Sequence, residues 1–596
     1  MSSLFRYTPF PDSKPPERIE SAAKRQLRNP SLRYFFLLGL CCLIFVGLGG
    51  RLAQLALSAA PEARSRTDGS EHLQRAKIVD RNGRLLADHI PVYEVFIRPV
   101  ETARGGQFSH DQNAALKQIF PDLDTTSLRR AVEAGSARFR FVARRASARQ
   151  WAEAQALGIV GLEAREISAR VYPPGRQVAH IIGGVDVDGK GVAGIERQLQ
   201  ERLTDPDTLG EPLELSVDLR VQNALRQTLF EAQSQFHALG AAGLVMDVRT
   251  GEMLSLVSLP DFDPNNRPEP PRGDAEAQAA SPLFNRATQG AYDLGSVFKL
   301  FTAATALETK VAQIDTPVDA RRPIRRGNYT ISDYLGKSRV LTLEEVIRYS
   351  SNIGAVRIAE LYGAKVQQDY LAHFGLAERV ALDELPPAER ARPLLPAKWD
   401  AAEVATVAYG HGISVSPLHL ATAIASIAND GCRVKPTLLR LKEAPTVCNR
   451  VVRSEVSTQI RSLMRTVGRL SSGRSANIPG YEIGGKTGTA HKVRPVGGYD
   501  LSKRFNSFVA LWPTTEPKYL MVVSLDDPKL LRTPGLDPLA GRTAAPTAGR
   551  AIERIAPLLG EAPMDRFRPQ PSPDEVDEIS EGGALPIFIE DEEVGG

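Results

Sequence analysis

The chain has 596 residues, 42% of them hydrophobic and 24% charged, and this composition excludes global disorder and collagen-like repeats. At roughly 100–200 residues per domain, a chain of this length holds three or more folded units. Its 74 basic and 70 acidic side chains leave a net charge of +4. Because this excess is dilute, it does not indicate nucleic-acid binding, and we expect no nucleic-acid partner.

The first predicted element is a membrane anchor. Residues 34–50 form an uncharged run of 17 residues between Arg33 and Arg51, which is at the short end for a helix that spans a bilayer. Basic residues precede the run, so the positive-inside rule places the N-terminus in the cytoplasm and exports the rest of the chain. A cleaved signal peptide and a buried core helix are the alternatives. The long polar leader and Pro61 favour an uncleaved, single-pass anchor.

An N-terminal exported domain is predicted next. Residues 78–79 predict a strand, and the Asn-Gly pair over residues 82–83 is a hairpin turn signal. Residues 111–158 look mostly helical, and Arg170 begins a rigid extended turn, Arg-Val-Tyr-Pro-Pro-Gly. A loop over residues 203–214 marks the boundary with the following domain.

The second exported domain is predicted to begin with a strand over residues 213–217 and a helix that opens near Asp218. Residues 242–247 and 252–259 predict a strand hairpin that is apolar on both faces, which is typical of the centre of a sheet. The other predicted elements are helices over residues 296–309, 342–362, 417–429 and 541–559 and strands over residues 505–512 and 519–525. This order indicates an α+β fold with helices packed on an antiparallel sheet.

The end of the chain beyond residue 561 is rich in proline and then purely acidic, which is typical of a disordered tail. Four cysteines are too few for a disulfide scaffold, and the sequence leaves open whether Cys432 and Cys448 are bonded. The histidines show no metal-ligand spacing, so we expect no metal site. The predicted segments are a basic cytoplasmic tail (1–33), the anchor helix and its extension (34–57), the N-terminal exported domain (58–210), the second exported domain (211–560) and the acidic tail (561–596).

Ser296 and Lys299 are the first candidate catalytic pair. Ser296 starts a predicted helix, and Lys299 follows one turn later on the same face. A serine hydroxyl becomes a good nucleophile only when a base takes its proton, and a lysine is such a base only when it is neutral. Burial and a neighbouring cation favour the neutral amine, and a helix N-terminus offers N–H groups to an oxyanion. On these residues alone, a capping serine with a surface lysine is the better explanation.

A second polar segment interrupts an apolar helical stretch with Ser350, Ser351 and Asn352. Solvated or capping side chains are the ordinary explanation. The functional one is that these residues line the site of Ser296, where Ser350 relays a proton and Asn352 orients a substrate amide.

A third segment, residues 484–489, is Gly-Gly-Lys-Thr-Gly-Thr. Glycines on a strand allow another chain to approach closely, so Lys486 would supply a cation near Lys299 while Thr487 and Thr489 hold a carboxylate. The alternative is a glycine-rich bulge on an edge strand.

The three segments in this order, Ser-x-x-Lys at 296, Ser-x-Asn at 350 and Lys-Thr-Gly at 486, resemble the penicillin-recognising serine acyltransferases. The motifs at Asp80 (Asp-Arg-Asn-Gly), at Arg170 and over residues 191–196 (Gly-Val-Ala-Gly-Ile-Glu) are similar to those in the pedestal of class B penicillin-binding proteins. The resemblance covers roughly residues 32–560 and is closest to the division-specific peptidoglycan transpeptidases of the penicillin-binding protein 3 type. Ala76, Leu294 and His411 depart from the usual family residues but lie outside the catalytic motifs.

This resemblance implies a fold and a reaction. The fold is α+β, with a single N-terminal transmembrane helix, an elongated pedestal and a transpeptidase domain whose antiparallel five-stranded sheet lies between helical layers. The reaction is septal D,D-transpeptidation: Ser296 attacks the D-Ala–D-Ala bond of a peptidoglycan stem peptide, releases D-alanine and passes the acyl group to a neighbouring stem. β-Lactam antibiotics acylate the same serine, and no cofactor is implied.

The resemblance also assigns roles to single residues. Lys299 is the base, Ser350 the proton relay and Asn352 the ligand of the donor amide. The remaining assignments are Lys486 as the support of Lys299 and of the substrate carboxylate, Thr487, Gly488 and Thr489 as substrate-binding residues, and the backbone N–H groups of Ser296 and Thr489 as an oxyanion hole.

The implied setting is the bacterial inner membrane, with a cytoplasmic N-terminus and a periplasmic catalytic domain. Implied partners are a polytopic glycan-polymerising glycosyltransferase and bitopic division proteins. Arg170 and Glu196, the charged pedestal motif residues, are candidates for an inter-domain or inter-protein pair, with a surface salt bridge as the alternative. The alternative functions are an elongation-specific class B transpeptidase and a protein that acts mainly as a scaffold of the division complex.

Overall fold

The protein is described here from a computed structural model. The described residues are 39, 42–43, 45–49 and 74–564, except 106–107, 274, 327–328, 495–497, 532 and 534. The chain divides into two units, residues 1–70 and 71–596, and the elements below belong to the second. Most of the predicted anchor, and the predicted tail beyond residue 564, lie outside the described residues. Among the residues that are described, no helix is both long and apolar enough to cross a membrane.

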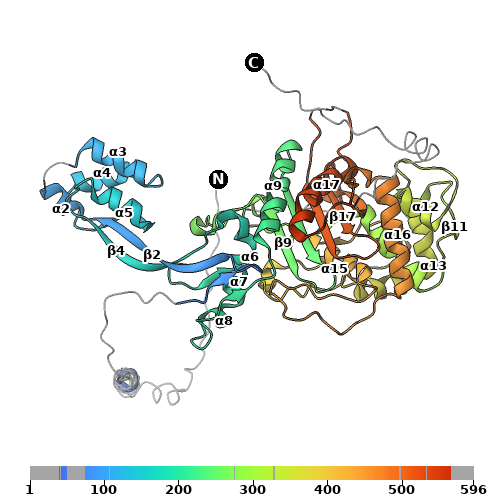
Figure 1. The fold of residues 1–596 in the computed structure, drawn as a ribbon, viewed down its shortest axis with the longest axis horizontal. Helices are drawn as coiled ribbons and strands as arrows, with labels where there is room; N and C mark the ends of the chain where they lie inside the picture. Colours follow the sequence, from blue (N-terminus) through green and yellow to red (C-terminus); the bar gives the residue numbers. More distant parts are fainter. Residues whose placement is uncertain are drawn as a thin grey trace, which may run out of the picture. The chain divides into compact units, whose positions relative to one another are not determined.

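The N-terminal part of the second unit is built on a five-stranded mixed sheet (Figure 1). The strand order is β3-β2-β1-β7, with β4 also paired to β2. β7 runs parallel to β1, whereas the other pairs are antiparallel. The strands are β1 (Ile78–Val79), β2 (Leu85–Ile97), β3 (Arg140–Ala146), β4 (Leu162–Val171) and β7 (Leu213–Glu214). The strand that we predicted to open the second domain therefore pairs with the sheet of the first.

Short helices pack against this sheet (Figure 1). Capping boxes, in which serine and glutamine side chains satisfy the first N–H groups, start two of them at Ser109 and Ser147. The helices are α2 (Pro99–Arg104), α3 (His110–Ile119), α4 (Thr125–Glu133) and α5 (Ala148–Gln155). The helical prediction for residues 111–158 is confirmed for α3, α4 and α5 but is wrong for β3. Phe141 of β3 lies opposite Phe96 of β2, and this pairing overrides the local helical pattern.

The pedestal motif residues meet inside the protein. Arg75 Nε and Arg170 Nε donate to the two carboxylate oxygens of Glu196 at 2.6 and 2.8 Å, and all three side chains are at most 1% exposed. The prediction of an inter-domain or inter-protein pair is therefore wrong, and so is the alternative of a surface salt bridge, because the buried triad joins elements of one domain. The elements around it are α6 (Ala179–Ile182), β5 (Gly184–Val185), β6 (Gly191–Ala193), α7 (Gly194–Gln198) and α8 (Gln200–Thr204).

The C-terminal part contains an antiparallel five-stranded sheet in the order β16-β17-β18-β8-β9 (Figure 1). The strands are β8 (Gly240–Asp247), β9 (Met253–Leu259), β16 (Gly484–Val493), β17 (Tyr499–Trp512) and β18 (Tyr519–Asp526). The predicted hairpin is confirmed, but its placement at the centre of the sheet is wrong because β9 is an edge strand. The side-chain amide of Gln222 pairs with both the N–H and the C=O of Leu256, each at 2.8 Å, so this edge is covered rather than exposed.

Helices cover both faces of this sheet, and two hydrophobic cores separate them from it. Leu244, Met246 and Val522 face the core that includes α11, α15 and α16, whereas Val245 and Met521 face the core that includes α9 and α17. The helices are α9 (Leu219–Gln235), α10 (Ala275–Ala280), α11 (Lys299–Glu308), α12 (Leu343–Arg348), α13 (Asn352–His373), α14 (Ala401–Val407), α15 (Pro417–Ala428), α16 (Ser454–Leu470) and α17 (Ala544–Ile555). The predicted α+β sandwich is thus confirmed for this domain.

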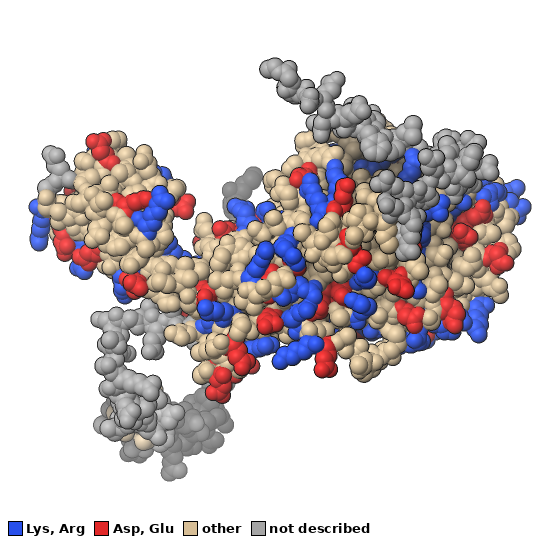
Figure 2. All heavy atoms as spheres, viewed as in Figure 1, with Lys and Arg blue, Asp and Glu red and all other residues tan. Residues whose placement is uncertain are grey.

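Three two-stranded ribbons lie outside the five-stranded sheet of this domain. They pair β10 (Tyr292–Asp293) with β15 (Ser414–Val415), β11 (Pro317–Asp319) with β14 (Val340–Thr342), and β12 (Ile324–Arg326) with β13 (Tyr329–Ile331). Cys432 and Cys448 form a disulfide, which settles the pairing that the sequence left open. Figure 2 shows lysine and arginine side chains interspersed with aspartate and glutamate on the face in view.

Candidate active site

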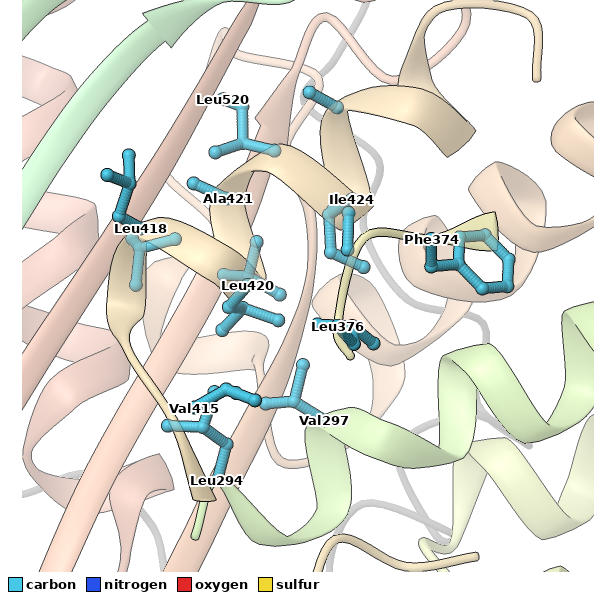
Figure 3. Close-up of a cluster of buried hydrophobic side chains, with 14 of the residues drawn as sticks. Leu294, Val297, Phe374, Leu376, Val415, Leu418, Leu420, Ala421, Ile424 and Leu520 are labelled. Carbon is cyan, nitrogen blue, oxygen red and sulfur yellow. The ribbon is translucent and has the colours of Figure 1, made fainter. Parts of the chain in front are cut away.

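Ser296 lies in a 3-10 turn, Gly295–Phe298, that leads directly into α11. Leu294 and Val297 on either side of it are fully buried and pack in a cluster with Val415, Leu420 and other apolar side chains (Figure 3). Gly295 has a φ of +57°, and a Cβ at this position would lie 2.4 Å from the carbonyl oxygen of Thr489. The backbone around Ser296 is therefore held firmly against β16, because only glycine fits there.

Lys299 is completely buried below Ser296, which excludes the surface lysine that we considered as the alternative. Its Nζ lies 2.9 Å from Ser296 Oγ, 3.1 Å from Ser350 Oγ and 2.8 Å from Asn352 Oδ1. Burial lowers the pKa of Lys299 well below its usual value, and the nearby charge of Lys486 lowers it further. With the amine neutral, the Ser296 hydroxyl donates to the Nζ lone pair, which is the arrangement that activates a serine.

Ser350 lies at a break between α12 and α13, so the single helix predicted over residues 342–362 is wrong at this point. Its φ of +58° is the left-handed conformation, which does not continue a helix. Its hydroxyl accepts from both lysines, at 3.1 Å from Lys299 Nζ and 3.0 Å from Lys486 Nζ. Ser350 therefore connects the two amines through one hydroxyl.

Lys486 approaches the site from the edge strand β16. It is completely buried, and burial lowers its pKa to about 7. Two amines that lie on either side of one hydroxyl cannot both carry a charge cheaply, since like charges at this separation repel. The arrangement therefore favours a neutral Lys299 when Lys486 is protonated.

Asn352 begins α13 and contacts both Lys299 and a neighbouring loop. Its Oδ1 accepts from Lys299, and its Nδ2 donates to the carbonyl of Ser332 at 2.9 Å. Ser351 caps α13 by accepting from the N–H of Gly354, and it donates to Asp333 at 2.6 Å. The three polar residues of this segment thus have separate contacts, and Ser351 is the one that serves the helix.

The glycine-rich segment forms the start of β16 and lies beside the Ser296 turn. A Cβ on Gly488 would lie 2.1 Å from the carbonyl oxygen of Leu294, so glycine is required for this approach. The Thr487 hydroxyl pairs with that of Ser472 at 2.7 Å, and the Thr489 hydroxyl accepts from the N–H of Ala540 at 3.0 Å. β16 is an edge strand, as the alternative explanation had it, but it pairs in regular register with β17 through this segment.

Asp293 is a polar residue beside the site that was not predicted from the sequence. Asp293 is buried and accepts from Ser414 Oγ at 2.5 Å, from the Gly412 N–H at 3.0 Å and from Tyr499 OH at 2.6 Å. It thereby holds the segment after α14 against the Ser296 turn. Its place three residues before Ser296 is the one sequence signal that pointed to it. Within the described part of the chain, no group of three or more His, Cys, Asp or Glu side chains is arranged to hold a metal ion.

A serine bonded to a buried lysine, a second serine that joins two lysines, and an antiparallel sheet between helical layers define a penicillin-recognising serine acyltransferase. Comparison with protein families agrees. The penicillin-binding protein transpeptidase domain matches residues 241–553, and the penicillin-binding protein dimerisation domain matches residues 71–211.

Similar proteins indicate which type of penicillin-binding protein this chain is. The probable peptidoglycan D,D-transpeptidase FtsI of Caulobacter vibrioides is 37% identical over 557 residues, which are 91% of each chain. Peptidoglycan D,D-transpeptidase FtsI of Escherichia coli K12 is 29% identical over 567 residues, with 89% of this chain and 93% of the relative covered. Penicillin-binding protein 3 of Mycobacterium tuberculosis, solved with aztreonam, has the same fold, with a TM-score of 0.61, 24% identity and coverage of 82% of this chain and 98% of that one. The chain belongs to the penicillin-binding protein transpeptidase family and is a class B protein of the FtsI type.

Proposed function

We propose that this protein is a septal peptidoglycan D,D-transpeptidase that works through an acyl-enzyme on Ser296. The observation that carries the proposal is the position of the Lys299 amine, which is buried and in contact with the hydroxyls of both Ser296 and Ser350. The family and the relatives named D,D-transpeptidase support the reaction.

In the acylation step, the neutral Lys299 amine takes the proton of Ser296 as Oγ attacks the carbonyl carbon of the D-Ala–D-Ala bond. The C–N bond breaks, and the leaving amine of D-alanine takes a proton that reaches it from Lys299 through the Ser350 hydroxyl. Ser350 suits this relay because it contacts both amines. The oxyanion would be stabilised by the N–H groups of Ser296 and Thr489, whose backbones approach each other at Gly295.

In the transfer step, the amine of a second stem peptide attacks the Ser296 ester. The ester C–O bond breaks, the amine loses a proton to the lysine relay, and Ser296 regains its hydroxyl. Before acylation, Asn352 would orient the donor peptide, while Lys486, Thr487 and Thr489 would hold the carboxylate of the terminal D-alanine that is later released, since a cation and hydroxyls are suitable partners for a carboxylate. β-Lactams would stop the cycle after acylation, because they leave an ester that the relay does not release quickly.

The cellular setting is also part of the proposal. The sequence pattern divides the chain into four segments after the cytoplasmic tail. They are an inner-membrane anchor over residues 34–57, a pedestal over 58–210, a periplasmic transpeptidase domain over 211–560 and an acidic tail over 561–596. A polytopic glycan-polymerising glycosyltransferase and bitopic division proteins are the expected membrane partners. The N-terminal segment of residues 1–33, which is rich in basic side chains, would stay in the cytoplasm.

Covalent labelling with a fluorescent penicillin tests the chemistry. The full-length protein in detergent should be labelled at Ser296, and the labelled peptide should be found by mass spectrometry. Labelling at another residue would contradict the assignment.

Depletion of the protein in cells tests its cellular role. Filamentous cells would support a septal role, and round cells that still divide would indicate a role in elongation. Restored division when the depleted cells express the Ser296→Ala variant would indicate a scaffold.

A further inference from the structure

Two loops are bonded to residues of the active site. The loop after β13 is held to the start of α13, because Asn352 Nδ2 donates to the carbonyl of Ser332 at 2.9 Å and Ser351 donates to Asp333. The loop after β18 is held to β16, because the N–H of Ala540 donates to Thr489 Oγ1 at 3.0 Å. Each loop is therefore attached to a different motif of the site.

The two loops are joined by a direct side-chain contact. Tyr334, two residues after Ser332, donates its hydroxyl to Asp537 Oδ2 at 3.0 Å, across 203 positions of sequence. Asp537 is fixed from the β17 side, since Arg504 Nη2 donates to its carboxylate at 2.9 Å and Arg542 donates to its carbonyl at 3.0 Å. The contact thus connects the α13 side of the site to the β16 side.

The contact lies on the solvent side of the catalytic residues. Tyr334 is 65% exposed, whereas Lys299 and Lys486 are fully buried. The contact joins the loop that is bonded to Asn352 and the loop that is bonded to Thr489. A hydrogen bond at this exposure is weak enough to open in ordinary fluctuations.

We propose that Tyr334 and Asp537 form a latch that spans the active site and limits which acyl donors reach Ser296. The proposal rests on the proposed function, because it takes Ser296 as the nucleophile. The latch has to open before a donor with a bulky side chain can bind, so closing it selects against such donors. Tyr334 and Asp537 are therefore specificity-determining residues that take no part in the bond changes.

The size of the effect follows from the chemistry of the contact. An exposed hydrogen bond of this kind favours the closed state by about a factor of five, so removing it raises the rate of entry by at most that factor. We expect Tyr334→Phe to raise the second-order rate constant for acylation by a bulky fluorescent penicillin about two- to fivefold.

The experiment compares four variants of the full-length protein in detergent. Tyr334→Phe and Asp537→Ala each remove the latch, and the double variant tests whether they act through one contact. Tyr93→Phe is the matched control, because it removes a tyrosine hydroxyl that lies 3.4 Å from Glu166, a carboxylate in the N-terminal domain. Thermal unfolding of each variant shows whether a rate change comes from damage to the fold.

The inference predicts that both single variants raise the rate, that the double variant raises it no further, and that Tyr93→Phe leaves it unchanged. Shared effects of this kind are expected when two residues act through one interaction. Unchanged rates in Tyr334→Phe, or a fall in rate, would overturn the latch; a fall would place Tyr334 in substrate binding instead. If the unaltered protein is not labelled at Ser296 at all, the proposed function fails rather than the latch.

Discussion

Glu196→Gln is the substitution that tests the buried triad of the N-terminal domain most directly. Glu196 is the one carboxylate that Arg75 and Arg170 share, and the three side chains are at most 1% exposed. The triad carries two positive charges and one negative charge. Replacing the carboxylate by an amide of the same shape leaves two buried guanidinium groups side by side without a counter-charge, whereas Arg170→Ala leaves the balanced pair of Arg75 and Glu196.

The magnitude follows from this difference. Breaking a buried ion pair by removing one partner costs about 3–5 kcal/mol of folding free energy. For a domain of this size, each 1 kcal/mol shifts Tm by roughly 2–4 °C, so we expect Glu196→Gln to lower the Tm of the N-terminal domain by about 10 °C. Arg170→Ala should lower it by less, because it removes one hydrogen bond to the Glu196 carboxylate, worth about 1.5–3 kcal/mol, without leaving an unbalanced charge.

Differential scanning calorimetry of the full-length protein in detergent measures this effect. Glu133→Gln is the control, because its pair with Arg129 lies on the surface of α4, with side chains 60% and 52% exposed, and it should leave Tm unchanged. Penicillin labelling at 25 °C should be normal in all three variants, since none of them contacts Ser296. A Tm for Glu196→Gln within 2 °C of that of the unaltered protein, or a larger loss for Arg170→Ala, would refute the reasoning about charge balance.

Three further predictions concern the catalytic domain. Ser296→Ala should abolish penicillin labelling and leave Tm nearly unchanged, because it removes one hydroxyl; labelling near the normal rate would place the nucleophile elsewhere. Replacing Cys432 and Cys448 by serine should lower the free energy of unfolding by about 3 kcal/mol, since the disulfide closes a short loop, without loss of labelling. Lys299→Met and Lys486→Met should each abolish labelling yet raise the stability of the domain at pH 7 by about 1–4 kcal/mol, measured by urea unfolding; a decrease in stability would show that the amines are net stabilising.

The fold could be predicted from the sequence where local pattern and position in the sheet agree. The hairpin of β8 and β9 was found because both strands are apolar on both faces, but the same pattern cannot distinguish a central strand from a covered edge. Gln222, which covers that edge, is a helix residue with no signal that it would pair with Leu256. β3 was missed because its pairing with β2 depends on a contact between distant segments.

The candidate site could be predicted as a set of residues but not as a geometry. Ser296, Lys299, Ser350 and Lys486 are brought together in the structure, and each belongs to a motif whose residue types are needed for acyl transfer. The contacts that support these residues were not predictable. For example, Ser351 donates a hydrogen bond to Asp333, and only the folded chain brings these two side chains together. Arg170 and Glu196 were expected to pair with another domain or protein, because the sequence shows their charge but not their burial against Arg75.

The two buried lysines explain why the active site works against the stability of its own domain. A lysine whose pKa falls on folding binds fewer protons in the folded state than in the unfolded one, so stability rises with pH between the two pKa values. For Lys486 these are about 7 and 10.5, and the difference corresponds to a destabilisation of about 5 kcal/mol at or below pH 7 that disappears as pH rises to 10.5. The lowered pKa of the neighbouring Lys299, which has the same main cause in burial, is what makes a neutral base available to Ser296. A methionine in either position would relieve this destabilisation but would remove the base or the relay, so stability and acylation should change in opposite directions in both variants.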